Sequence, residues 1–193
     1  MSTPSDLYSF VLRGDIARDS AERALGKADA DHSELYDSFL QRLPFDLIDQ
    51  DLVARARAMS VVYTAMAAFE NAARKFISDR LLEEKGANWW EEAVSNKIRG
   101  DADKRKRDEE HHRYHGERGQ SMISYCQLGD LTSIMQNNEA VFADYIPNIE
   151  WVRQIMRQVE RSRNVIMHGG ELSMNDIERV AMNIRDWLRQ IGG

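Results

Sequence analysis

Apolar residues recur at steps of three and four through most of the chain, a spacing that indicates amphipathic helices. The first such segment covers residues 5–25, and a second covers residues 33–43 before Pro44 ends it. Together they predict a helical hairpin, which is either part of the bundle or a docking arm. The longest helical pattern follows at residues 49–84. These patterns predict an all-α fold.

The helical pattern with the clearest division into two faces covers residues 150–168 and ends at Gly169 and Gly170. On a wheel of about 100° per residue, its apolar side chains form one stripe centred on Val159. Either glycine can adopt the left-handed conformation that ends a helix, so His168 is expected in the last turn. The opposite, polar face carries Arg153, Arg157, Arg161, Asn164 and His168. A capping box at residues 173–176 then predicts a final helix to residue 191, which is expected to run antiparallel to the helix at residues 150–168.

Arg163 breaks this division, because it falls about 40° from the centre of the apolar stripe. A buried guanidinium needs an acidic partner. Glu70 is the candidate, since it occupies an apolar row of the helix at residues 49–84 and is itself costly to bury alone. The alternative is a local ion pair between Glu70 and Arg74, four residues further on. The sequence leaves both partners open.

The composition of the 193 residues fits a helical protein: 42% are apolar, 30% are charged and three are prolines. The single cysteine, Cys126, excludes an internal disulfide framework and fits a reducing compartment. The longest nearly apolar run, residues 61–69, is far shorter than the roughly 18–20 residues of a membrane span. We therefore expect a soluble, cytoplasmic protein with no membrane partner. Because the net charge is −6, any nucleic-acid site must be local.

Residues 97–118 are dense in charge. Four basic residues at 104–107 are followed by three acidic ones, which favours a solvated helix. The alternative is a rim that follows phosphates, to which Arg99, Arg113 and Arg118 contribute. His111, His112 and His115 lie in this stretch, but no further residue is available as a third metal ligand. The sequence therefore predicts no metal site and no cofactor.

The hexapeptide from Arg163 to His168, R-N-V-I-M-H, resembles the Arg-x4–6-His motif of the HEPN superfamily, including the polar residue that follows the arginine. Its position near the end of a penultimate helix is similar too, as are the early helix with Glu70, the Trp89-Trp90 pair and the Y-x-x-x-G-D-L segment from Tyr125. The resemblance covers residues 49–191, and it implies a HEPN-like up-and-down helical bundle. We therefore expect an N-terminal helical extension at 1–45 and a HEPN-like domain at 46–193.

In that family, two protomers form a composite cleft that cleaves RNA without a metal. The resemblance implies a homodimeric endoribonuclease in a defence or toxin-like setting. Arg163, Asn164 and His168 would be catalytic, Glu70 supporting, and Arg153, Arg157 and Arg161 would bind phosphate. The resemblance is also compatible with a nucleotide ligand and with a cognate antitoxin or another protein partner. The alternatives are a catalytically inactive dimerisation or nucleotide-binding scaffold, and a helical interaction protein without a nucleic-acid role.

An ideal helix separates Arg163 and His168 by about 140°, so one chain does not readily direct both at one phosphate. Either the helix distorts near Gly169, or the site is shared across a two-fold axis. The sequence therefore predicts a homodimer in which His168, Asn164, Arg157 and Arg161 face the cleft. Arg163 then reaches the cleft from its edge or is held by Glu70.

Overall fold

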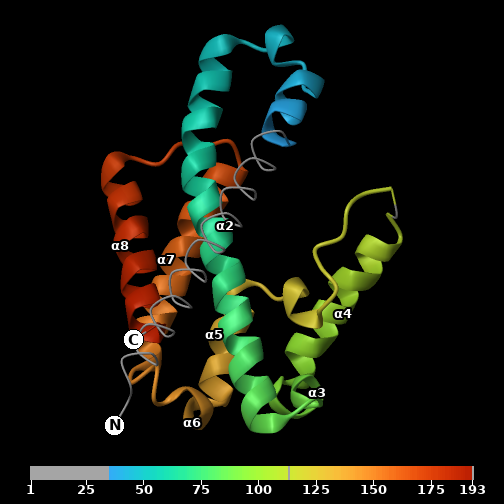
Figure 1. Cartoon of the computed structure of the whole chain (residues 1–193), viewed down its shortest axis with the longest axis vertical. Helices are drawn as coiled ribbons and strands as arrows, with labels where there is room; N and C mark the ends of the chain where they lie inside the picture. The colour runs from blue at the N-terminus through green and yellow to red at the C-terminus, as the bar shows by residue number, and fades with distance from the viewer. Residues whose placement is uncertain (1–34, 113, 193) are drawn as a thin grey trace, which may run out of the picture. The chain divides into compact units, whose positions relative to one another are not determined.

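The computed structural model describes residues 35–112 and 114–192 (Figure 1). Residues 35–42 are helical. The following elements are η1 (Phe45–Leu47), α2 (Gln50–Lys85), α3 (Trp89–Ala93), α4 (Asn96–Glu110), η2 (Met122–Tyr125), α5 (Leu128–Asn137), α6 (Glu139–Phe142), α7 (Ile149–Met167) and α8 (Met174–Ile191). The described residues form helices and no strand, so the prediction of an all-α fold is confirmed.

The expected helices agree closely with the observed ones where the chain is described. The pattern at residues 49–84 corresponds to α2, and the last two patterns correspond to α7 and α8. The first helix of the predicted hairpin lies outside the described residues. The chain divides into two compact units, Met1–Val53 and Ala54–Gly193, with the division inside α2. The predicted domain boundary at residue 45 stays a prediction.

The core of the second unit forms where one row of α2 meets the apolar stripes of the C-terminal helices. Along α2 the buried row comprises Met66, Phe69, Ala73, Ile77 and Leu81. The stripe predicted for α7 is buried except at Ile166, which is partly buried, and α7 packs against α5 and α8. At the junction of α2 and α8, the fully buried Trp187 meets Phe69 and Phe76 edge to face, at centroid distances of 5.8 and 5.9 Å. Each such pair adds about 0.5–1.5 kcal/mol beyond simple burial.

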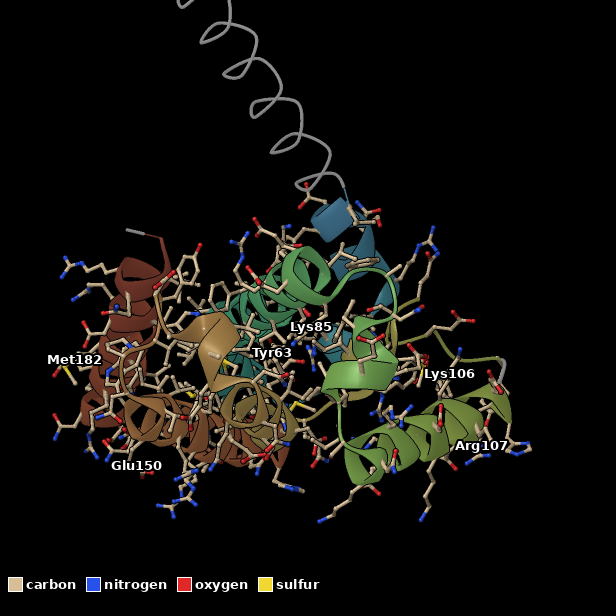
Figure 2. The ribbon with its side chains drawn as sticks, turned by 90° about the horizontal axis from the view of Figure 1, so that it is seen from below. Tyr63, Lys85, Lys106, Arg107, Glu150 and Met182 are labelled. Carbon is tan, nitrogen blue, oxygen red and sulfur yellow. The ribbon has the colours of Figure 1, made fainter. Side chains whose placement is uncertain are left out.

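Helices α8 and α4 lie on opposite sides of α2 (Figures 1 and 2). Figure 2 labels Met182 on α8 at one edge and Lys106 and Arg107 on α4 at the other. After α4 the chain returns through η2, which packs against α4, and leads into α5. This return is what brings the segment before α5 close to α2 and α7.

Helix α2 carries much of its apolar surface outside the core. Its most apolar 18-residue window has a mean hydropathy of 1.2, and 17% of that window is buried. By length and composition, such a helix could cross a membrane, although core helices of soluble proteins meet the same description. The expected absence of a membrane partner therefore stays a prediction.

Candidate active site

The C-terminal end of α7 places the residues of the Arg-x4-His segment. Asn148 caps the start of this helix by accepting the Glu150 N–H at 2.9 Å. At the other end, the Gly169 N–H donates to the Ile166 carbonyl and the Gly170 N–H to the Val165 carbonyl, at 2.9 and 2.8 Å. With Gly169 at φ 77°, this is a Schellman motif. It ends the helix immediately before His168, whose φ and ψ of −98° and 17° depart from helical values.

A cavity of about 630 Å³ opens beside this helix end. Three parts of the chain line it, namely α2, the segment from residue 118 to 127, and the last turns of α7. Its lining residues are Tyr63, Ala67, Glu70, Asn71, Arg74, Arg118, Ser124, Cys126, Gln127, Arg163, Asn164, Met167 and His168.

Arg163, Asn164 and His168 of a single chain all line this cavity. The sequence predicts that Arg163 and His168 of one chain do not readily meet at one phosphate unless the helix distorts near Gly169, and α7 does end at Met167. Two features let one cavity extend to both residues. His168 follows the last helical residue, so the ideal wheel no longer places it. The cavity is also wide enough to extend from the partly buried Arg163 to the exposed Asn164 and His168.

Glu70 joins two arginines at the buried side of this cavity. Its side chain is 10% exposed, and its Oε2 lies 2.9 Å from Nη1 of Arg163. Its Oε1 accepts from Nη2 of Arg74 at 2.5 Å. The same Nη2 also donates to the Cys126 carbonyl at 3.0 Å, which ties α2 to the segment before α5. Both partners that the sequence left open are thus present, because one carboxylate has two oxygens to offer.

The described residues that line the cavity carry an excess of positive charge. Arg74, Arg118 and Arg163 contribute three guanidinium groups, whereas Glu70 contributes one carboxylate. Such a lining attracts a phosphodiester group in a protein whose net charge is otherwise −6.

The family model for Swt1-like HEPN domains matches residues 64–192, which is more than half of the chain. The chain belongs to this family. No curated protein and no solved structure matches it. The matched region contains α3 to α8 and most of α2, and therefore nearly the whole cavity lining. HEPN domains are associated with ribonuclease activity, and the all-α architecture of the chain is consistent with the assignment.

Cys126 is the thiol that lines the cavity of this HEPN domain. Burial, with a smaller contribution from Asp130, raises the pKa of the Cys126 thiol to about 12. Because the thiolate is the nucleophilic form, this residue is inert at neutral pH. His168, by contrast, contributes an exposed imidazole, a group suited to proton transfer near neutral pH.

The arginines predicted to bind phosphate do not line the cavity. Arg153 is bonded to Glu150 and, at 2.7 Å, to Gln136, while Arg157 and Arg161 are exposed elsewhere on α7. Besides Arg163, the described arginines that line the cavity are Arg74 of α2 and Arg118 of the segment after α4. Arg74 was detectable in sequence only as a neighbour of Glu70. Arg118 belongs to the charge-dense stretch and was named there as part of a possible rim that follows phosphates.

Amide and hydroxyl groups surround these charges. Asn71 accepts from Nη1 of Arg74 at 3.0 Å, so its own NH2 group is left to donate. Tyr63 and Gln127 also line the cavity, although no motif in the sequence marks them as site residues. Among residues 35–112 and 114–192, no group of three or more His, Cys, Asp or Glu side chains could hold a metal ion.

Proposed function

We propose that this Swt1-like HEPN domain is a metal-independent endoribonuclease that acts in a defence or toxin-like setting. The observation that carries the proposal is the cavity in which Arg163, Asn164 and His168 meet an excess of guanidinium groups. A phosphodiester backbone is the ligand that such a lining favours, and an imidazole beside it supports a proton-transfer reaction.

The reaction is an attack of a ribose 2′-hydroxyl on the adjacent phosphorus. The new bond joins O2′ to phosphorus, the bond to O5′ breaks, and the products are a 2′,3′-cyclic phosphate and a 5′-hydroxyl. One proton leaves O2′ and one is delivered to O5′. His168 takes or supplies one of these protons, because its imidazole lines the cavity.

Arg163 stabilises the charge that develops on the phosphate. Its contacts to Glu70 use Nη1, and within the described part of the chain Nε and Nη2 have no partner. The guanidinium is therefore held at one end and available to a phosphate at the other, which is the preorganised arrangement that electrostatic catalysis requires. The exposed Asn164 amide orients the phosphate or the ribose.

The test is RNA cleavage by the purified protein in EDTA, with identification of the product ends. We expect His168→Ala to lower the rate by about 100-fold or more, as for loss of a general acid or base. Arg163→Ala should lower it by roughly 100- to 1000-fold, as for loss of a charge-stabilising donor. The matched controls are His111→Ala and Arg179→Ala, which alter an exposed histidine and an exposed arginine outside the cavity. The proposal fails if the folded His168 and Arg163 variants cut as fast as the parent.

A non-catalytic role is the second candidate, and the contact between Arg163 and Glu70 is the observation that favours it. An arginine that bridges α7 to a buried carboxylate of α2 has a structural function without any reaction. The domain would then be a scaffold that binds RNA or a nucleotide in the same cavity. Binding of RNA without cleavage, reduced by Arg74→Gln, would support this second candidate.

A further inference from the structure

Among the described residues of the segment between α4 and η2, Arg118 is the one that lines the cavity. It lies far from the Arg-x4-His segment in sequence, yet it lines the same cavity as Arg163 and His168. Its side chain is 56% exposed, whereas that of Arg163 is 23% exposed. Arg118 therefore occupies the solvent side of the cavity, and Arg163 the buried side.

Glu109, near the end of α4, holds Arg118 at two points. The Arg118 backbone N–H donates to Oε1 of Glu109 at 2.7 Å, and the Arg118 Nε lies 3.3 Å from Oε2. The Glu109 side chain is only 15% exposed. A largely buried carboxylate thus fixes both the backbone and the side chain of an exposed residue nine positions further along the chain.

Tyr125 in η2 fixes Glu109 in turn. Its hydroxyl donates to Oε1 of Glu109 at 3.1 Å, and the residue is buried. Burial, and then this hydrogen bond to the carboxylate, raise the pKa of the Tyr125 hydroxyl above its ordinary value. The hydroxyl therefore stays protonated at neutral pH and remains a donor. The chain of contacts runs from a buried tyrosine through a carboxylate to a guanidinium at the cavity.

The remaining donors of Arg118 are available to a ligand. The ion pair with Glu109 uses Nε, and among the described residues neither Nη nitrogen has a partner. These two nitrogens present the paired N–H groups that fit the oxygens of a phosphate.

We propose that Arg118 binds a backbone phosphate of RNA that flanks the scissile one, and that Glu109 is its positioning residue. The proposal rests on the proposed function and names a second point at which the same site holds its substrate. The alternative is a purely structural role, in which the ion pair of Glu109 and Arg118 only holds the segment between α4 and η2 against α4. Exposed ion pairs of this kind contribute little to stability by themselves.

The test measures binding of the full chain to a single-stranded RNA with 2′-O-methyl ribose at every position, which lacks the attacking hydroxyl. Fluorescence anisotropy is followed as a function of salt. We expect Arg118→Gln to weaken binding by about fivefold at low salt and to reduce the slope of log Kd against log salt by about 0.7, the value for one phosphate contact on a single strand. Arg118→Lys should retain the slope, and Arg179→Gln is the control for an exposed arginine outside the cavity.

The Glu109→Gln variant tests whether Glu109 positions Arg118 or only contributes its negative charge. Removal of an anion beside a phosphate site should tighten binding if only net charge matters. If Glu109 positions Arg118, the variant instead binds more weakly, with a salt slope like that of the parent. The double variant with Arg118→Gln should then bind no more weakly than Arg118→Gln alone, because the two residues act through one contact.

Three results would overturn the proposal: no binding of the probe by the parent protein, an unchanged Kd and slope for Arg118→Gln, or tighter binding by Glu109→Gln. Because the probe cannot be cleaved, this outcome does not depend on catalysis. If the parent protein binds the probe through Arg118 but cleaves no RNA, the proposed nuclease activity is refuted. The phosphate contact of Arg118 is still supported in that case.

Discussion

Glu70 shows at the scale of a single residue how a charge can be kept in a helical core. Its carboxylate is almost buried, and its neighbours along α2 are the apolar side chains of the core. An unpaired charge in that position would cost several kcal/mol. Arg74 from the same helix and Arg163 from α7 together supply its counter-charge, so the two helices are joined at the cavity.

Glu70→Gln should lower the free energy of unfolding by about 2 to 3 kcal/mol, because it leaves two partly buried guanidinium groups without a counter-charge. The variant keeps the shape of the side chain, so packing changes little. Urea denaturation of the two proteins measures the difference. Glu84→Gln, at an exposed position of the same helix, is the control and should unfold like the parent. Equal stability of all three proteins would show that Glu70 is not required to pair the arginines.

At the scale of an element, the end of α7 decides where His168 lies. The Schellman motif needs a left-handed residue at Gly169 and a close approach of Gly170 to the preceding turn. A Cβ atom on Gly170 would lie 2.7 Å from Cγ1 of Val165 and 2.9 Å from its carbonyl oxygen. Both distances are shorter than real contacts allow. The two glycines are therefore part of what positions the histidine.

Gly170→Ala should lower the free energy of unfolding by about 1–3 kcal/mol, as for other overpacked positions. It should also reduce RNA cleavage, because relief of the clash shifts the turn that carries His168. The matched control is Gly100→Ala within α4, where an added Cβ meets nothing within 4 Å. That variant should be unchanged or more stable by up to about 1 kcal/mol. Thermal unfolding and RNA cleavage are measured for both variants. Equal stability and equal cleavage rates of the two variants would contradict the role assigned to the turn.

At the scale of the whole molecule, the proposed reaction requires two proton transfers, and among the described residues of one chain the cavity has one imidazole. A second copy related by a two-fold axis would bring a second His168. Met167 at the cavity is 60% exposed, which provides an apolar side chain for such a contact. These features support the homodimer that the sequence predicts, although Arg163 and His168 already share a cavity within one chain.

We expect the specific activity to fall in proportion to protein concentration once dilution separates the protomers. Sedimentation velocity and cleavage rates measured over the same concentrations provide the comparison. The His111→Ala protein should follow the parent in both. Full activity of a demonstrated monomer would reject the shared site and leave the single-chain cavity as the complete active site.

Several features of this domain depend on local rules and could therefore be predicted from the sequence. The helices follow from apolar periodicity, and the end of α7 follows from two consecutive glycines. The need of Arg163 for an acidic partner follows from its place near the apolar stripe, and Glu70 meets that need. In each case the information lies within a few turns of one helix or in the cost of burying a charge.

The tertiary structure alone decided which side chains share the cavity. It brought Arg74 and Arg118 to the Arg-x4-His segment and left Arg153, Arg157 and Arg161 outside it. It also gave Glu70 two partners instead of one. The physical reason is that these outcomes depend on how α2, α7 and the segment after α4 approach one another. A helical wheel describes one helix at a time, so it can assign a residue to a face but cannot say what that face meets.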